Sequence, residues 1–501
     1  MRKKMTRVGL FYVGAMLVIV AIVSSCAKGF DGDETFTSTV KDSQLASPTL
    51  NESCFSSKVN ADGTESVQVS WEVVPGAGGY YCHVDNVDDP ANPVVVFDGN
   101  VDGTSFLFDK ADDTKYSVSV KTLGNAKLNN KEATDATVFA YSTMVPAQVI
   151  PVGTDIADFI NSHLIDTNDE QAFELQANGN YTLNSEVDFG THKVTFRGDK
   201  VHAPIVTIGY DGVIRTAAGL KIKWIKFDCT EQNSRGVVEC SINPPAELEA
   251  TNFSGYPDKA YILKETILLQ DCWFKNVKWC LFFTGQCAWG CEDVRVDNCL
   301  VQLDNNGNWG DAAVISGYTN GGMYKGSASS WNGAIRNLTI KNSTFYNIKD
   351  NAKNRFIRYT NSVRSGLNAI FDTASGSATF SNNTFVKTMS DKEFGNATPN
   401  NSSFEINFDG NILCISARIS KFIQGNCKVN ALKDHNTTWT DRASGDGTQQ
   451  GADLNYCSEE NPDFDLEQNL KPLDLNATNG GVNFKPSGAI SGTIGDPRWL
   501  Q

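Results

Sequence analysis

The feature that most constrains the fold is a degenerate repeat in the second half of the chain. Its clearest copies each read apolar, polar, Asn or Asp, small, any residue, apolar, and they are Leu269–Val277, Val296–Val301, Ile340–Ile348 and Phe380–Val386. One such unit cannot bury its apolar face alone, but stacked units share a continuous core. Asn and Asp tolerate left-handed backbone and bond to neighbouring backbone groups. The repeat therefore predicts stacked β-coils that turn at each Asn or Asp.

The spacing of the turn residues predicts where the stack is interrupted. Asp271 and Asn298 are 27 residues apart, close to one coil, whereas the next intervals, to Asn342 and Asn382, are 44 and 40 residues. Either whole coils there lack the pattern, or loops of 17 (44 − 27) and 13 (40 − 27) residues are inserted. Inserted loops on a stacked scaffold lie at the surface, where binding residues concentrate. The run from Phe408 to Ile415 is a candidate for a further coil.

The segment before the repeat looks like the start of a β-helix. Thr154–Ile160 has an N-cap residue and helical apolar spacing. Strand-like runs follow at Phe173–Gln176, Gly179–Leu183 and Val194–Gly198. This order resembles the opening of pectate-lyase-like right-handed parallel β-helices, in which a helix caps the open end of the first coil. The resemblance implies a right-handed parallel β-helix over residues 150–501.

The end of the chain carries a second resemblance. Asn461–Phe464 and Gly495–Trp499 are similar to the C-termini of uncharacterised β-helix lipoproteins from glycan-degrading gut anaerobes. Those proteins often carry a fibronectin-type module in front of the β-helix. The resemblance implies a role in glycan utilisation and partnership with other outer-membrane glycan-uptake proteins.

Residues 46–145 have the pattern of a β-sandwich. Short alternating runs with turn signals between them cover about a hundred residues. Trp71 at the end of one run and Tyr116 at the start of another resemble a fibronectin type III module, in which the tryptophan fills the core and the tyrosine hydroxyl ties down a corner. The resemblance implies a spacer or docking unit and makes the whole chain an all-β protein. Whether Cys54 and Cys82 form a disulfide stays open.

The N-terminus predicts export and a lipid anchor. Four basic residues precede an apolar run from Val8 to Val23, which ends in Ser24, Ser25 and Cys26. This order is typical of a secretory signal, and its end resembles the bacterial lipobox, which implies cleavage before Cys26 and lipid on that cysteine. The alternative, an uncleaved membrane span, needs about 20 apolar residues. We expect a signal peptide over 1–25, a flexible acidic tether over 26–45 and a location on the outer membrane facing the exterior.

Composition excludes one class of partner. Removal of the four basic signal residues leaves 39 Lys and Arg (43 − 4) against 58 Asp and Glu, a mature charge of −19 (39 − 58). Nucleic-acid binding needs clustered cations and is not expected of such an acidic chain. Twelve cysteines remain besides Cys26, and most are predicted to be small buried apolar groups. Cys287 and Cys291 lie four apart but lack further ligands, so no structural zinc is predicted.

Two groups of residues near the expected insertions are candidates for a glycan site. The first is aromatic side chains set among Gly, Asn and Ser, whose flat faces suit a sugar ring, namely Trp289, Trp309, Tyr318, Tyr324 and Trp331. Their alternative role is to hold a loop on the β-helix, whereas Trp279, Phe282 and Phe283 are expected in the core.

The second group is basic. Eight Lys and Arg stand against one acid, Asp350, between Ala312 and Phe371. A basic patch on an acidic protein attracts anionic ligands, and Arg pairs well with carboxylates and sulfates. The candidates for such contacts are Lys353, Arg355, Arg358 and Arg364. Their alternative role is as solvated strand faces.

Catalysis and metal binding have little support in the sequence. Arg355, Arg358 and Lys353 have the charge that a uronate lyase uses, but no acid cluster accompanies them. The run Asp304–Asn308 starts like a calcium loop yet lacks glycine at the sixth position and the closing glutamate, so a turn is expected and no cofactor is predicted. A glycosidase needs two facing carboxylates, which the sequence does not pair.

Three functions follow from these observations. The leading hypothesis is a surface lipoprotein that binds a polysaccharide, with an acidic one favoured by the basic run. The alternatives are a β-helix polysaccharide lyase or hydrolase, and a structural or adhesive surface protein.

Overall fold

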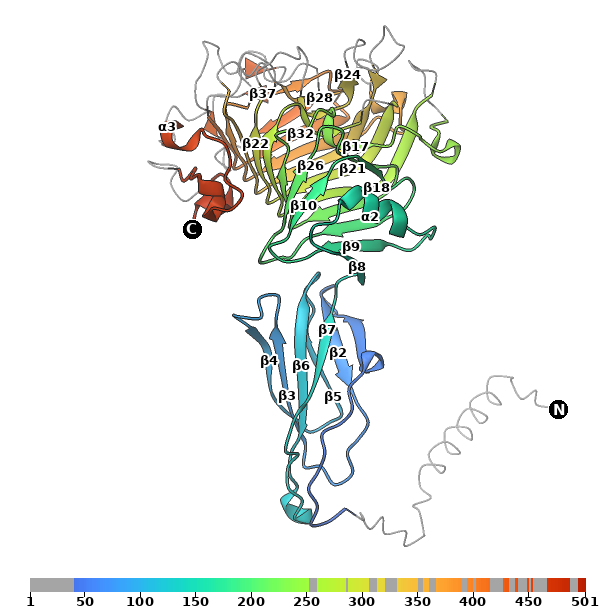
Figure 1. The fold of residues 1–501 in the computed structure, drawn as a ribbon, viewed down its shortest axis with the longest axis vertical. Coiled ribbons are helices and arrows are strands. Elements are labelled where there is room, and N and C mark those ends of the chain that lie inside the picture. The colour runs from blue at the N-terminus through green and yellow to red at the C-terminus, as the bar shows by residue number, and fades with distance from the viewer. Residues whose placement is uncertain are drawn as a thin grey trace, which may run out of the picture. The chain divides into compact units, whose positions relative to one another are not determined.

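The computed structural model has two compact units, residues 1–144 and 145–501, and Figure 1 shows each of them as strands with few helices. The residues that it describes are 40–251, 259–284, 287–305, 313–319, 331–349, 355–359, 366–388, 394–399, 402–414, 427–431, 438–439, 448–449, 452–453, 466–486 and 494–501. Within these ranges no helix combines the length and the apolar character needed to cross a bilayer. The signal segment and Cys26 lie outside the described residues.

The first unit is a β-sandwich of three plus four antiparallel strands. One sheet has the order β1-β2-β5, with β1 Phe55–Val59, β2 Glu65–Ser70 and β5 Ser105–Asp109. The other has the order β4-β3-β6-β7, with β3 Tyr80–Asn86, β4 Val94–Val101, β6 Lys115–Thr122 and β7 Thr137–Ser142. Short 3₁₀ turns η1 (Glu52–Cys54) and η2 (Ala126–Leu128) complete the unit.

The sandwich core is built from the inward faces of these strands. Trp71 packs edge-on against Tyr80 with ring centroids 5.1 Å apart, and the hydroxyl of Tyr116 accepts a hydrogen bond of 2.9 Å from the backbone N–H of Ala111. The predicted corner role of Tyr116 is thus confirmed. Cys54 and Cys82 are separate buried thiols.

The end of the expected tether belongs to the sandwich. Gln44 forms a parallel bridge with Lys131, and the backbone N–H of Leu45 donates to the carbonyl of Lys131 over 3.1 Å. Leu45 is buried. The described part of the tether, residues 40–45, is therefore packed rather than flexible, because its backbone has hydrogen-bonding partners in the sandwich that composition does not reveal.

The second unit is a right-handed parallel β-helix with three sheets, here called A, B and C, of ten, nine and seven strands. Sheet A contains β8 Ala147–Ile150, β9 Gln171–Leu175, β12 Val194–Arg197, β15 Leu220–Lys223, β18 Tyr261–Gln270, β21 Trp289–Asp297, β26 Ala334–Lys341, β29 Gly376–Ser381, β32 Phe404–Asp409 and β34 Lys428–Ala431. Sheet B contains β10 Asn180–Leu183, β13 Ile205–Ile208, β16 Lys226–Asp228, β19 Trp273–Val277, β22 Leu300–Leu303, β27 Thr344–Asn347, β30 Thr384–Val386, β33 Ile412–Cys414 and β35 Thr438–Trp439.

Sheet C contains β11 Glu186–Asp188, β14 Val213–Thr216, β17 Gly236–Cys240, β20 Cys280–Phe283, β23 Ala313–Ser316, β28 Arg355–Arg358 and β31 Gly395–Asn396. Two short antiparallel pairs are β24 Tyr318–Thr319 with β25 Trp331–Asn332, and β36 Thr448–Gln449 with β37 Ala452–Asp453. The remaining helical segments are α2 Ile156–His163, α3 Leu466–Asn469, η3 Ala246–Leu248, η5 Leu367–Ala369, η8 Thr478–Gly481 and η10 Pro497–Trp499.

Each coil passes from sheet A to B to C, and equivalent side chains stack along the interior. Phe227 and Phe274 on neighbouring strands of sheet B stack with centroids 5.1 Å apart. Helix α2 closes the first coil, as expected, and buries Ile156 and Ile160 in the same core (Figure 1). Its N-cap is Asp155, whose Oδ1 accepts from the N–H groups of Ala157 and Asp158. Asp155 lies within the segment Thr154–Ile160 that the sequence predicts to carry the cap.

The turn from sheet A to sheet B, here called the A–B corner, confirms the central prediction of the repeat. Asp271, Asn298, Asn342 and Asn382 all occupy this corner with φ between 51° and 53°, the left-handed region that Asn and Asp tolerate. Strands β21 and β26 are direct neighbours despite the 44-residue interval. The long intervals are therefore single coils with inserted loops.

A C-terminal segment covers the outer face of sheet B. Apolar side chains of residues 473–499, Leu473, Leu475, Phe484 and Trp499 among them, form one cluster with outward residues of the sheet such as Leu300 and Ile412. Asp496 Oδ2 accepts from the hydroxyl of Thr344 over 2.7 Å. The segment therefore forms a wall beside the A–B corner.

Candidate functional site

The aromatic candidates are not brought together as one exposed surface by the described residues. Trp289 is completely buried, and its indole N–H donates to the carbonyl of Ser241 over 2.7 Å. It is a core residue of β21, so its prediction as a sugar-binding face is wrong. Tyr318 and Trp331 lie in β24 and β25, whose side chains are outside the described part, as are Trp309 and Tyr324.

The basic run is largely neutralised where it can be followed. Lys341 lies 3.1 Å from Asp297, Arg336 lies 2.9 Å from Glu292, and Lys349 lies 2.9 Å from Asp304. Each acid belongs to the preceding coil, which a count along the sequence cannot register. Lys353 and Arg364 fall outside the described residues.

Arg355 and Arg358 both lie in β28 of sheet C, Arg355 buried and Arg358 half-buried. The register of sheet C places Arg358 on one line that runs from coil to coil through Asp188, Arg215, Glu239, Phe283, Ser316, Arg358 and Asn396. Several members of this line are buried, with Glu239 and Ser316 at 0% exposure. The line is therefore largely closed to a ligand in this structure.

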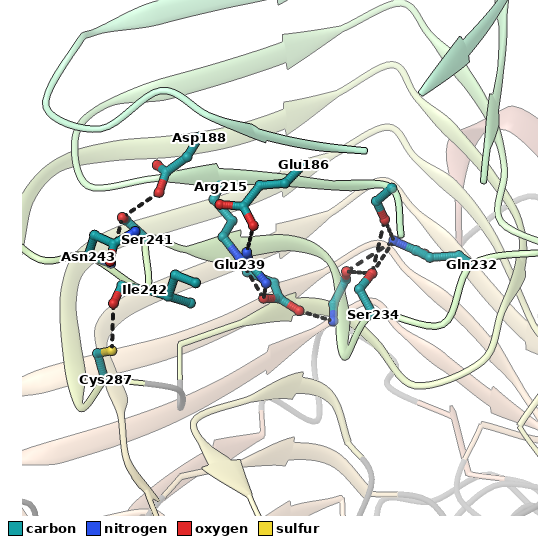
Figure 2. Close-up of polar contacts among 12 residues, drawn as sticks. Glu186, Asp188, Arg215, Gln232, Ser234, Glu239, Ser241, Ile242, Asn243 and Cys287 are labelled. Carbon is teal, nitrogen blue, oxygen red and sulfur yellow. Dashed lines mark hydrogen bonds and ion pairs between the residues drawn. The ribbon is translucent and has the colours of Figure 1, made fainter. Parts of the chain in front are cut away.

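Arg215 and Glu239 of this line and the neighbouring Glu186 form a network of ion pairs and hydrogen bonds, as Figure 2 shows. Arg215 lies between Glu186 and Glu239, with its Nε and Nη2 each 3.0 Å from Oε2 of Glu239. Burial raises the pKa of Glu239 against the opposing pull of Arg215. Burial alone would lower the pKa of Arg215, but the two carboxylates raise it overall. With carboxylates on two sides, this guanidinium is poorly placed to bind a further anion.

The polar neighbours of this network are also occupied by the protein itself. Ser241 donates to Asp188 over 2.6 Å, as Figure 2 shows, and Gln232 donates to the carbonyl of Gly212 over 3.0 Å. Among the residues that the structure describes, no group of three or more His, Cys, Asp and Glu side chains is arranged to hold a metal. The polar side chains of this network are thus bonded to one another and to the protein backbone.

A different site lies on the A–B corner. A pocket of about 660 Å³ extends over the corner turns of the early coils and against the C-terminal segment, within the roughly 300–1,000 Å³ of small-ligand sites. We call it the corner pocket. Its lining is Asn178, Lys200, Val201, His202, Ala203, Trp224, Lys226, Asp271, Trp273, Asn298, Asn476, Ala477, Thr478 and Arg498. Three of these side chains are Lys or Arg and one is an acid.

The backbone around the corner pocket is fixed locally. Asp199 Oδ1 accepts from the N–H groups of Val201 and His202 at 3.0 and 2.7 Å, which shapes the loop that carries Lys200. On the opposite wall, Asp474 Oδ1 accepts from the N–H of Asn476 over 2.9 Å. Both walls are therefore held by short Asx turns.

Two tryptophans position the lysines. Trp224 is buried, and the Nζ atoms of Lys200 and Lys223 lie 5.8 and 5.7 Å from its ring centroid. Lys226 and Trp273 are register partners on sheet B, so the Nζ of Lys226 stands 4.6 Å from the centroid of Trp273. Cation–π contacts at these distances favour defined ammonium positions.

Lys226 is a half-buried cation of the pocket lining. Its Nζ donates one hydrogen bond, 2.9 Å long, to the carbonyl of Leu475, although an ammonium carries three donors. Burial lowers the pKa of Lys226, and the more distant Asp474 offsets this only in part. An anion entering the pocket would therefore stabilise a charge that the protein only partly compensates.

The single acid of the pocket is already engaged. Oδ2 of Asp271 accepts from the indole N–H of Trp224 over 3.2 Å, and Oδ1 accepts from the amide of Asn298. The amide oxygen of Asn298 in turn accepts from Arg498 over 2.9 Å. Asp271 thus orders the corner, and the pocket keeps a positive balance.

Sequence reasoning missed this site although a signal was present. Ile222-Lys223-Trp224-Ile225-Lys226-Phe227 follows the repeat with Trp in place of Asn or Asp at the corner. Trp224 has φ of 56°, a left-handed conformation that is an outlier for a bulky residue. Such strain often marks a functional position.

Two families of unknown function match parts of the chain. DUF4992 matches residues 2–188, and DUF4957 matches residues 179–348. No curated protein matches the sequence.

Two solved structures are similar to this chain, both with low sequence identity and a low TM-score. One is the PL6 family alginate lyase AlyGC, with 12% identity and a TM-score of 0.32, over 62% of this chain and 43% of that one. The other is pectate lyase PelI from Erwinia chrysanthemi in complex with tetragalacturonic acid, with 8% identity and a TM-score of 0.15, over 78% of this chain and all of that one. The chain spans less than half the length of the alginate lyase. The fold assignment rests on the strand ladders described above.

Proposed function

We propose that this protein is an exported, lipid-anchored lipoprotein whose β-helix binds an acidic polysaccharide in the corner pocket. The observation that carries the proposal is the set of three cations, Lys200, Lys226 and Arg498, around one engaged acid in a protein with a net charge of −15. A cationic recess on an acidic protein selects anionic ligands.

The shape of the pocket supports a chain-like ligand. Its lining follows the A–B corner from Asn178 in the first coil to Asn298 four coils later. Four strand spacings of roughly 4.8 Å make a length of about 19 Å. Exposed Asn178, Asn476 and Thr478 offer amide and hydroxyl groups along it, which suit sugar hydroxyls.

The N-terminal part supports a surface role. The signal-like segment and Cys26 would attach the chain to the outer membrane, facing the exterior. The three-plus-four strand order of the sandwich and the Tyr116 corner support a fibronectin type III module that acts as a spacer. Other outer-membrane glycan-uptake proteins would then be its partners.

Affinity electrophoresis of the mature chain tests the binding function. Gels containing polyuronates or sulfated glycans should retard the protein, and added salt should weaken the effect because it screens charge. Lys226→Met should weaken binding about tenfold, since a hydrogen bond to a charged group contributes about 1.5 kcal/mol or more. Lys259→Met is the control, because Lys259 pairs with Glu249 outside the pocket. Mobility unaffected by every acidic glycan would refute the proposal.

The anchor is tested separately. Cys26→Ser should move the protein from the membrane fraction to the soluble fraction, and the wild-type N-terminal peptide should carry the mass of attached lipid. A wild-type protein with an unmodified Cys26 would contradict the anchor without touching the glycan-binding proposal.

A lyase is the second candidate, favoured by the half-buried Arg358 of β28, whose guanidinium has the charge that a uronate lyase uses. Lyase action leaves an unsaturated sugar that absorbs ultraviolet light. Release of such ends from a polyuronate, lost in Arg358→Met, would replace the binding function by an enzymatic one.

A further inference from the structure

Two buried cysteines face each other inside the β-helix. Cys240 ends β17, the sheet C strand of the coil β15-β16-β17, and Cys291 lies in β21 of sheet A, which begins the coil two further along. Their Sγ atoms are 3.5 Å apart, and both side chains are buried. We propose that Cys240 and Cys291 form a disulfide in the exported protein that joins the two coils.

Other cysteines of the β-helix are arranged differently. The Sγ of Cys272 points to the carbonyl of Gln270 at 3.2 Å, and the Sγ of Cys299 points to the carbonyl of Asp297 at 3.4 Å. The Sγ of Cys287 contacts the carbonyl of Ile242 at 3.5 Å. Cys240 and Cys291 instead contact each other through their sulfurs, and closing the bond shortens this distance to about 2.05 Å.

The burial of the two thiols determines when the disulfide can form. Burial raises the pKa of Cys240 well above its usual range, so the folded chain holds little thiolate there, and the thiolate is the reactive form. Oxidation therefore takes place while the coils assemble. The oxidant is a disulfide, either of a protein or of a small thiol, in the oxidising compartment that export implies.

The exchange balances in two steps. One cysteine thiolate attacks the external disulfide, forms a mixed disulfide and expels one thiolate. The second cysteine then attacks its partner's sulfur, forms the Cys240–Cys291 bond and expels the other thiolate. The two protons lost by the cysteines pass to the two expelled thiolates, and the two electrons reduce the external disulfide.

Mass spectrometry of the full chain from the cell envelope tests this inference, which rests on the proposed export. The protein is alkylated in denaturant without reduction and digested. We expect peptides containing Cys240 and Cys291 to be cross-linked, with two hydrogens lost. Dithiothreitol should then lower Tm by about 5–10 °C.

Two variants sharpen the result. Cys240→Ala should make Cys291 available to alkylation, whereas Cys272→Ala should leave the cross-link intact. If Cys240→Ala fails to fold, the wild-type peptide map still decides. Alkylation of both wild-type cysteines in a chain whose Cys26 carries lipid would overturn the disulfide alone. Alkylation of both cysteines in a chain that keeps residues 1–25 would instead count against export.

Discussion

The indole N–H of Trp224 donates to Oδ2 of Asp271 over 3.2 Å and so links the corner residues of two consecutive coils. Both residues have left-handed backbone, with φ of 56° and 53°, but only Asp271 is of a type that adopts it easily. Trp224 therefore occupies a position where the repeat has a small polar residue, and its indole contacts Lys200 of the corner pocket. Trp224 thus has a strained backbone conformation and also lines the corner pocket.

Trp224→Asn should separate these two roles. Loss of a buried indole costs about 3–5 kcal/mol, and relief of left-handed strain returns about 1–3 kcal/mol. We expect a folded variant, destabilised by about 0–4 kcal/mol in denaturant unfolding, that binds acidic glycans more weakly. Trp224→Phe keeps a ring beneath the lysines and should retain more of the affinity. Equal affinity of Trp224→Asn and wild type would remove Trp224 from the site.

Trp289→Ala should affect stability and leave binding unchanged. Its indole is fully buried and lies 5.6 Å from the ring of Tyr261, so its removal opens a cavity that costs about 3–5 kcal/mol. Thermal unfolding measures the loss, and affinity electrophoresis of the folded fraction measures binding. Reduced glycan affinity in a fully folded variant would restore Trp289 as a sugar-binding residue.

The corner positions can be tested with a matched pair of substitutions at Asn382, whose φ is 53°. Asn382→Gly should be nearly neutral, because glycine adopts this conformation freely. Asn382→Val should cost about 1–3 kcal/mol, because a β-branched residue is strained there. Similar midpoints for both variants in urea would show that the left-handed corner does not determine stability.

The corners can be predicted from the sequence because their chemistry is local. The Asn or Asp at Asp271, Asn298, Asn342 and Asn382 tolerates left-handed backbone and so marks the corner of these four coils in the sequence. The strands around the corners can also be predicted locally, because successive side chains of a strand point to opposite faces and so tend to alternate between apolar and polar. The stacked coils and their turns therefore follow from the sequence alone.

The site cannot be predicted in the same way, because its contacts cross between coils. The partners of Lys341 and Arg336 are Asp297 and Glu292, about 44 residues earlier in the sequence. One wall of the corner pocket consists of residues 476–478 and Arg498. Even Asn476, the nearest of these in the sequence, is more than 170 residues after Asn298. A local charge count thus overstates the basic run and overlooks the pocket.

Arg215→Met should reveal what the buried network of sheet C contributes. It leaves Glu239, which is 0% exposed, without its cation, and such a loss costs about 3–5 kcal/mol. The double variant Arg215→Met, Glu239→Met should recover most of this, because no unpaired charge remains. Unfolding free energies of the three proteins measure the difference, and a double variant no better than the single one would contradict it.

The Arg215→Met variant also has a pH dependence of known sign. Without the cation, burial raises the pKa of Glu239 further above its unfolded value. A raised carboxyl pKa favours the folded state below the unfolded pKa, and this advantage is lost as pH rises through the folded pKa. The deficit of Arg215→Met should therefore be smaller at pH 4 than at pH 8.

His83 should make the sandwich more stable in mild acid than in mild base. The hydrogen bond to Asp98, 2.8 Å long, raises the pKa of His83 against the effect of burial, and Asp85 adds to the increase from 3.1 Å. A raised histidine pKa gives stability that is fully present below the unfolded value and is lost as pH rises through the folded value. Both carboxylates face solvent, so we expect the protonated His83 to stabilise the sandwich by at most about 1 kcal/mol.

Hydrogen exchange of β3 and β6 peptides in the full chain, corrected for intrinsic rates, should show slower opening at pH 5.5 than at pH 8.5. His83→Gln is the control, since it cannot carry charge and should show no such difference. If the variant keeps the full pH dependence, another group is responsible, and the protonated His83 bridge does not stabilise the sandwich.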